Sequence, residues 1–303
     1  TDLTKLIIDT PGTYQEKHDF ILGFPTGYVN IEKMLSGDRV RFEDLLTGGE
    51  FVRRVFDALK QVTFGTAKGP GEFGLAVLSP HIKITGKGDL NIGKKTIELK
   101  ANVGASGGRL GTPGSLAYEN VSAIIAKYTG LPEAKLKSDN LGLGGLVKLT
   151  ANLDAGKRQK LGKELFDYIF GGVVDVSPLV SALVAGDEAT LKKAYTATNY
   201  LHYQKETGFE GVMLMNFQKQ ELKYYTDPAM MADEVYEPGV YIISKDKAFQ
   251  ARQILCQVTL RPFKEPPLVV PTAAAATDKE SQSTVEQFAQ QLAAKNKITD
   301  PAV

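Results

Sequence analysis

The chain has very few of the residues that build the commonest metal and redox sites. Cys256 is the only cysteine among 303 residues, which excludes an internal disulfide and a zinc site made of cysteines. The three histidines, His18, His81 and His202, lie far apart in the sequence and make a weak case for a histidine metal site. We therefore expect any chemistry to come from carboxylates and lysines, in a reducing, cytoplasmic setting.

A net charge and a long apolar run are also missing. Lysine and arginine number 36 and aspartate and glutamate 35, for a formal net charge of +1. No overall field therefore draws the chain to nucleic acid or to an anionic membrane, and a site for a polyanion has to be local. No apolar run approaches the ~20 residues that span a bilayer, and the polar residues 1–10 do not resemble a signal peptide. We expect no membrane partner.

The composition that remains is that of an ordinary globular protein, 43% hydrophobic and 23% charged. Hydrophobic periodicity predicts helices near residues 50–62, 72–78, 115–127, 157–169, 178–184 and 188–206. It predicts strands at 88–92, 95–101, 211–217, 220–225, 239–244 and 254–261. This mixture indicates an α/β or α+β fold with a mixed sheet. We divide it into an N-terminal helical segment packed on the core (1–65), an α/β core (66–262) and a C-terminal segment (263–303).

The C-terminal segment has a composition of its own. Residues 266–276 are rich in proline and alanine, which is typical of an extended linker. Ser283–Glu286 has the capping-box pattern that opens a helix, here to about residue 295. The apolar residues of that helix fall on one stripe and are Val285, Phe288, Ala289 and Leu292. We predict that the helix at 283–295 docks on a protein partner or on a second copy of this chain.

The stretch Gly88–Ala101 predicts a β-hairpin that separates polar from apolar side chains. Gly93-Lys94 suits a two-residue turn, and the numbers of facing residues then sum to 187, which places Asp89 opposite Glu98. Side chains alternate between the two faces of a sheet. The polar face is predicted to carry Asp89, Asn91, Thr96, Glu98 and Lys100, and the apolar face Leu90, Ile92, Ile97 and Leu99.

Two facing carboxylates destabilise a hairpin unless their repulsion is removed. A divalent cation removes it, because Mg²⁺ binds oxygen ligands and commonly uses one or two carboxylates with water and phosphate. Lys100 lies on the same face and can hold an attacking water or steady the charge on a phosphate. Two acids and a lysine on one face therefore indicate phosphodiester cleavage. An amphipathic hairpin that presents these residues to water is the simpler alternative.

Asp89 followed by Glu98-Leu99-Lys100 resembles the D…(D/E)-X-K signature of the PD-(D/E)XK nucleases. The resemblance implies a restriction-endonuclease-like core, in which a mixed sheet carries a catalytic hairpin flanked by helices. It implies that Asp89, Glu98 and the Leu99 backbone carbonyl bind Mg²⁺ or Mn²⁺, and that Lys100 is catalytic. It also implies that Glu72, on the helix before the hairpin, supports the metal site.

The resemblance covers about residues 69–110, with one departure from the signature. The family's proline before the first acid is replaced here by Gly88. The same stretch is similar, more faintly, to nuclease-like proteins of tailed phages.

Positive charge is concentrated around the hairpin. Residues 81–110 contain six basic and two acidic residues, so this stretch carries +4 and the rest of the chain −3. We expect DNA phosphates to meet Lys87, Lys94 and Arg109. Backbone N–H groups of Gly104–Gly111 can cradle a phosphate, and a plain connector is an equal alternative.

Three other patterns are not expected to carry function. Gly88–Lys95 has Walker A spacing, but Lys95 replaces the required Ser or Thr and the interior has a strand pattern, so ATP binding is not expected. The glycine cluster Gly142–Gly145 is predicted to be a turn. The aromatic run Tyr195, Tyr200, His202 and Tyr203 has near-helical spacing and is predicted to be packing.

The sequence thus predicts a Mg²⁺-dependent endo- or exodeoxyribonuclease, in the host cytoplasm or in the virion if a phage encodes it. Glu72, Asp89, Glu98 and Lys100 would act in the site. The alternative is a structural or assembly protein of a phage particle that keeps the nuclease-like fold and binds DNA or protein partners. The linker and docking helix after residue 263 favour that alternative.

Overall fold

The computed structural model describes residues 3–60, 69–85, 88–102, 108–111, 116–132, 136, 142–234, 239–243 and 253–260. The chain divides into one compact unit over Thr1–Lys264 and another over Glu265–Val303. All described residues belong to the first unit. The predicted linker and the helix predicted at 283–295 therefore lie outside the described residues.

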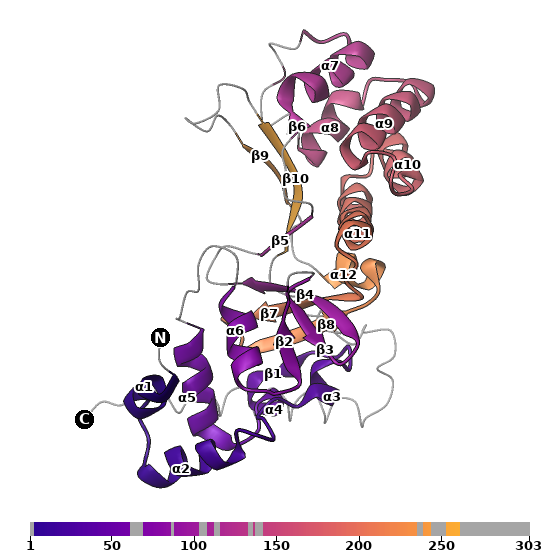
Figure 1. The fold of residues 1–303 in the computed structure, drawn as a ribbon. Coiled ribbons are helices and arrows are strands. Elements are labelled where there is room, and N and C mark those ends of the chain that lie inside the picture. The colour runs from indigo at the N-terminus through magenta and orange to yellow at the C-terminus, as the bar shows by residue number, and fades with distance from the viewer. Residues whose placement is uncertain are drawn as a thin grey trace, which may run out of the picture. The chain divides into compact units, whose positions relative to one another are not determined.

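The N-terminal segment is mostly helical, as predicted (Figure 1). Its elements are α1 (Leu3–Asp9), α2 (Tyr14–Gly23), α3 (Ile31–Met34), β1 (Val40–Arg41), α4 (Phe42–Leu45) and α5 (Gly49–Leu59). A capping box starts α2, because Thr13 accepts the Glu16 N–H at 3.2 Å and its own N–H donates to the Glu16 carboxylate at 2.7 Å. The amphipathic helix predicted near 50–62 is α5, which buries one face of the helix in the core.

A mixed sheet of six strands lies at the centre of the described fold, which confirms the predicted α/β class. Its other strands are β2 (Ile82–Ile84), β3 (Leu90–Ile92), β4 (Lys95–Asn102), β7 (Gly211–Asn216) and β8 (Glu221–Tyr225). The order is β1-β8-β7-β4-β3-β2, with β4 and β7 parallel and every other pair antiparallel. The short strand β2 was not predicted from the sequence.

The predicted hairpin forms with the predicted register over three pairs. Residue pairs 90–97, 91–96 and 92–95 face one another, and Gly93 enters the turn with φ +62°. The four apolar residues expected on one face are all buried in a single core cluster. The predicted pair of Asp89 with Glu98 lies beyond this ladder, as described below.

Seven further helices are α6 (Pro70–Val77), α7 (Tyr118–Thr129), α8 (Leu143–Thr150), α9 (Ala155–Phe170), α10 (Ser177–Ala185), α11 (Glu188–Thr207) and α12 (Pro228–Glu234). The prediction of a turn at Gly142–Gly145 is wrong. Gly142 has extended backbone and serves as the N-cap of α8. This helix buries Leu143 and Leu146 in the core. Helix α12 was not predicted.

A second, smaller sheet is built around β10 (Gln253–Leu260). This strand is antiparallel to β5 (Gly108–Leu110), β6 (Leu116–Ala117) and β9 (Gly239–Ile243). Arg109 pairs with Thr259, so the backbone at 108–110 takes part in a strand ladder. This part of the predicted phosphate cradle Gly104–Gly111 is therefore a strand, and residues 104–107 lie outside the described residues.

The apolar core consists of two clusters on the two faces of the large sheet. Alternation along β7 shows the division: Val212 and Leu214 belong to the cluster with α7–α11, whereas Met213 and Met215 belong to the cluster with α5, α6 and the hairpin. The N-terminal segment shares the second cluster and contributes β1 to the sheet. The large sheet thus divides the apolar core into two parts.

Candidate active site

Glu98 and Lys100 lie on the face of β4 that α11 covers. Glu98 is only 2% exposed, and its Oε1 is 2.5 Å from the Lys100 Nζ. From α11, the Tyr203 hydroxyl donates to the same Oε1 at 3.0 Å. The Lys100 Nζ also lies 5.7 Å from the centre of the Tyr203 ring. One acid, one base and one phenol therefore form a buried cluster, in which both donors converge on a single carboxylate oxygen.

Asp89 reaches the same strand by leaving the ladder. Gly88 has φ +64°, and the Asp89 N–H donates to the Ile97 carbonyl at 3.0 Å, one residue out of register. The expected cross-strand pair of Asp89 with Glu98 is thus not formed, because the left-handed Gly88 ends the regular pairing at Leu90. Instead the Asp89 Oδ2 accepts the Leu99 N–H at 2.8 Å. Both carboxylates are still held at β4, Glu98 as a residue of the strand and Asp89 through the N–H of Leu99.

The charges of the cluster are coupled. Burial raises the pKa of Glu98, the nearby Lys100 ammonium opposes that rise, and the Asp89 carboxylate adds to it. Burial also raises the pKa of the Tyr203 hydroxyl, and the charge of Glu98 raises it further. Tyr203 therefore stays protonated and can donate to Glu98 across the whole physiological range.

Each of the two carboxylates keeps one oxygen uncommitted. Lys100 and Tyr203 both use Oε1 of Glu98, and Leu99 uses Oδ2 of Asp89. Within the described part of the chain, Oε2 of Glu98 and Oδ1 of Asp89 make no hydrogen bond. The carbonyl of Leu99 leaves β4 on the same side as its N–H, toward Asp89 and beyond the start of β3. Asp89 and the Leu99 carbonyl thus lie toward the β3 edge of β4, and Glu98, the residue before Leu99, lies on the face that α11 covers.

Such a set fits a hard divalent cation. Mg²⁺ commonly takes one or two carboxylates and completes its octahedron with water and phosphate oxygens. Among the described residues, no three or more His, Cys, Asp or Glu side chains come together as a metal site. Two carboxylates and a carbonyl are therefore the most that this site supplies.

Glu72 lies on α6, the helix before the hairpin, and its carboxylate caps that helix. It is 6% exposed, and its Oε1 accepts the Gly69 N–H at 2.9 Å, which caps α6. Helix α6 packs on the apolar face of the sheet, where Gly71 lies against the side chains of Leu99 and Met215. Glu72 does not form a three-carboxylate group with Asp89 and Glu98. The structure gives it a role in holding α6.

The residues expected to meet phosphate are only partly in place. Lys87 lies outside the described residues. Lys94 is exposed in the turn of the hairpin, and Arg109 is exposed on β5. Strand β5 approaches β4 closely, because a Cβ on Gly108 would lie 2.9 Å from the Lys100 Cβ. Only glycine permits this approach, which brings the backbone beside Arg109 to β4.

Tyr203 is the site residue that the sequence analysis missed. The expectation of packing is confirmed for the aromatic run: Tyr195 and Tyr200 are fully buried in the core, and His202 and Tyr203 make ring contacts with Phe170 and Phe209. Tyr203 has, in addition, the hydrogen bond to Glu98 that the prediction did not include. Tyr203 and Glu98 are 105 positions apart, so no local pattern links them. One sequence signal could have found it. The hydroxyl of a partly buried tyrosine on a helix needs a polar partner, here on the sheet that the helix covers.

A second cluster of the same composition lies on the same sheet face. The Lys223 Nζ is 2.6 Å from the Glu234 Oε1, and the Tyr225 hydroxyl donates to the Glu234 Oε2 at 2.9 Å. Lys223 faces Leu214 on β7, and Leu214 faces Lys100 on β4. Both oxygens of Glu234 accept hydrogen bonds from β8. The cluster therefore attaches α12 to β8 and leaves no carboxylate oxygen for a metal.

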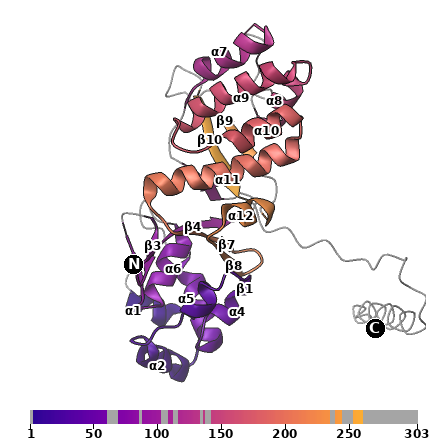
Figure 2. The same cartoon turned by 90° about the vertical axis from the view of Figure 1, so that its right-hand side faces the viewer.

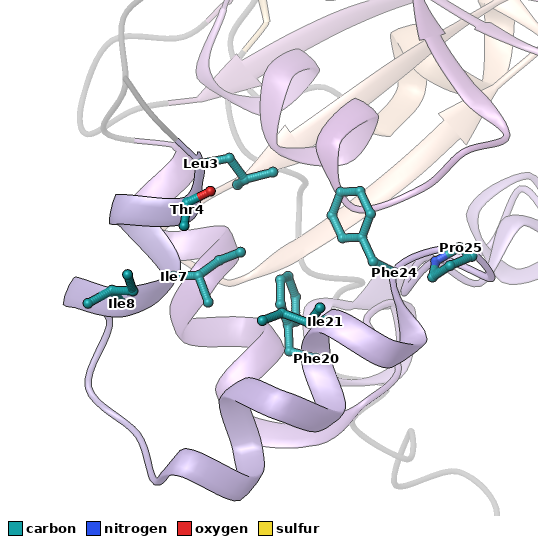
Figure 3. A pocket seen from close by; sticks show the side chains of 8 residues that line it. All are labelled: Leu3, Thr4, Ile7, Ile8, Phe20, Ile21, Phe24 and Pro25. Atoms are coloured by element: carbon teal, nitrogen blue, oxygen red, sulfur yellow. The ribbon is translucent and has the colours of Figure 1, made fainter.

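An apolar cavity of about 450 Å³ lies elsewhere, between α1 and α2 (Figure 3). Seven of its eight lining residues are apolar, and the eighth is Thr4. It contains no titratable side chain, so it offers nothing for acid–base or metal chemistry.

Comparisons of the chain with family models, with curated proteins and with solved structures find no match. Over the described residues, no helix combines the length and the apolar character needed to cross a membrane.

Proposed function

We propose that the chain is a metal-dependent phosphodiesterase whose metal binds at Asp89, Glu98 and the Leu99 carbonyl. More narrowly, we propose a nuclease that hydrolyses DNA phosphodiester bonds with Mg²⁺ or Mn²⁺. One observation carries the proposal: two carboxylates, each with one uncommitted oxygen, are held at neighbouring positions of β4 beside a lysine. The succession α6, β2, β3, β4, α11 and β7, with β5, β6 and α7–α10 inserted between β4 and α11, supports the narrower form, since it gives a mixed sheet with a hairpin flanked by helices.

The roles of the residues follow from their contacts. A bound divalent cation would supply a Lewis acid and would neutralise the charge of the two carboxylates. Tyr203 holds Oε1 of Glu98 and so leaves Oε2 as the ligand oxygen. Lys100, whose side chain is 18% exposed, can exchange its bond to Glu98 for one to a phosphate oxygen or to an attacking water.

A structural protein that keeps this fold is the second candidate, and one observation favours it. Lys100 and Tyr203 already neutralise and hydrogen-bond Glu98 without any metal. A cluster satisfied in this way can serve only to join α11 to the sheet, as Lys223, Tyr225 and Glu234 join α12 to it.

A cleavage assay separates the two candidates. Supercoiled plasmid, linear duplex and single strands are incubated with the full chain in Mg²⁺, in Mn²⁺ or in EDTA. The nuclease proposal expects metal-dependent cleavage by the wild type and none by Glu98→Gln or Asp89→Asn. Asp167→Asn is a matched control, because its carboxylate pairs with Lys163 on the surface of α9, and it should cleave like the wild type. Absence of cleavage of every substrate by folded wild-type protein contradicts the proposal.

A further inference from the structure

A cavity of about 850 Å³ opens at the turn end of the hairpin. Four segments of the chain line it: α3, the turn before β2, β2 itself and the β3–β4 hairpin. Its polar lining consists of His81, Lys83, Asn91, Lys94 and Lys95. A volume of this size suits a small ligand or a segment of a larger one.

The polar lining of the cavity carries positive charge and no negative charge. None of its lining residues is acidic, and its three lysines make no ion pair with a described residue. Several other surface lysines of the chain do pair, as Lys163 does with Asp167 at 2.8 Å and Lys193 with Asp233 at 2.6 Å. Three unpaired ammonium groups around one cavity therefore indicate an anion as the ligand.

The strand register places these groups around the turn end of the hairpin, on both of its faces. Lys83 faces Asn91 across β2 and β3, so their side chains lie together on one face. Lys94 lies in the turn, and Lys95 pairs with Ile92 and leaves the other face, where its Nζ lies 5.8 Å from the centre of the Tyr224 ring. The Oδ1 of Asn91 is buried and has no hydrogen-bond partner. Because an amide can flip, this position can also present the NH₂ group to an anion.

The cavity lies at one end of the strand that carries the candidate active site. Lys95 and Glu98 are three residues apart on β4, ~10 Å along the strand, and their side chains leave opposite faces of the sheet. Residues 81–110, which include both, carry a charge of +4, which favours a polyanion that passes the turn end of the hairpin. We propose that the cavity binds a backbone phosphate of the nucleic-acid strand that is cut at Asp89 and Glu98. The strand assignment rests on the proposed function, whereas the anion site does not.

The test measures binding without turnover. A fluorescent single-stranded oligonucleotide is titrated in EDTA at several salt concentrations with the full chain. The double variant Lys83→Ala/Lys95→Ala should bind more weakly than the wild type, with a salt-dependence slope lower by roughly one to two units. The matched control is Lys5→Ala/Lys160→Ala, which removes the same charge from two exposed lysines of α1 and α9. It should keep the wild-type slope.

The outcomes separate this proposal from the nuclease proposal. An unchanged affinity and slope in Lys83→Ala/Lys95→Ala, with both double variants folded, overturns the cavity as a phosphate site. Binding that depends on Lys83 and Lys95 in a protein that cuts nothing supports the cavity and contradicts the nuclease. If the cavity binds inorganic pyrophosphate and the oligonucleotide does not compete, the ligand is a free phosphate compound and the strand assignment is wrong.

Discussion

At the scale of single residues, the site depends on how one buried carboxylate is shared. Lys100 and Tyr203 both contact Oε1 of Glu98, and burial raises the pKa of that carboxyl. An acid whose pKa is raised by folding stabilises the fold while protonated, and this contribution is lost as pH rises through the folded pKa. The Lys100 ammonium is therefore needed most at neutral and higher pH, where Glu98 is ionised.

Lys100→Met should show this dependence directly. Removing one partner of a buried ion pair leaves an uncompensated charge, so the variant should lose roughly 3 kcal/mol of unfolding free energy near neutral pH. The loss should shrink as pH falls and Glu98 becomes protonated. The double variant Glu98→Gln/Lys100→Met should recover most of the loss. Urea unfolding at several pH values measures both effects, and a pH-independent loss contradicts the coupling of the two groups.

Tyr203→Phe tests the phenol that the sequence analysis missed. Its hydrogen bond lowers the pKa of Glu98, so its removal should raise that pKa further. Glu98 must be ionised to bind metal, and the acid limb of the cleavage profile should move to higher pH. The hydrogen bond itself is worth about 1 kcal/mol of stability. A profile that falls in amplitude without moving along the pH axis would show that Tyr203 only packs.

At the scale of elements, the sequence predicted those parts of the fold that local pattern controls. Alternation of apolar residues predicted β3 and β4 with the correct register, and helical periodicity predicted α9 and α11 to within two residues at each end. The three-residue strand β2 is too short to show a period, and α8 begins in a glycine cluster that reads as a turn. The position of Asp89 depends on the φ of Gly88, and Tyr203 reaches Glu98 through the tertiary fold. Neither of these two relations can be read from a local sequence pattern.

Gly88→Ala tests whether this glycine places Asp89. Gly88 has φ +64°, and a Cβ there would lie 2.6 Å from the Thr96 Cγ2 and 3.3 Å from the Ile97 carbonyl oxygen. The substitution should cost about 1–3 kcal/mol and weaken the response to metal, because the Asp89 carboxylate is displaced. Gly93→Ala is the matched control, since Gly93 has φ +62° with open space around it. It should cost about 1 kcal/mol and keep the metal response. Equal metal responses in the two variants contradict the role of Gly88.

At the scale of the whole molecule, the described unit is organised by the two faces of its sheet. The cluster with α5 and α6 buries the apolar side of the hairpin, and α11 covers the side that carries Glu98 and Lys100. Figures 1 and 2 show α6 on one side of the sheet and α11 on the other. The chain's second unit is Glu265–Val303. We therefore expect catalysis to need the first unit and association to need the second.

Deletion of residues 265–303 tests that expectation. The truncated chain should cleave DNA at the wild-type rate and lose an association that the full chain shows, since the apolar stripe predicted at 283–295 needs a partner surface. Light scattering gives the mass of each form, and the plasmid assay gives the rate. Lost cleavage with unchanged mass would assign the C-terminal unit to the active site.

The central claim is that Asp89 and Glu98 share a divalent cation, and thermal unfolding in a Mn²⁺ titration tests it most directly. Binding to the folded state alone should raise the melting temperature of the wild type, by about 2.7 kcal/mol of stability at a hundred times Kd. Glu98→Gln and Asp89→Asn should lose this response, whereas Lys223→Met, in the cluster without a free oxygen, should keep it. A wild-type melting temperature that Mn²⁺ does not change, or a response that survives in Glu98→Gln, contradicts the account.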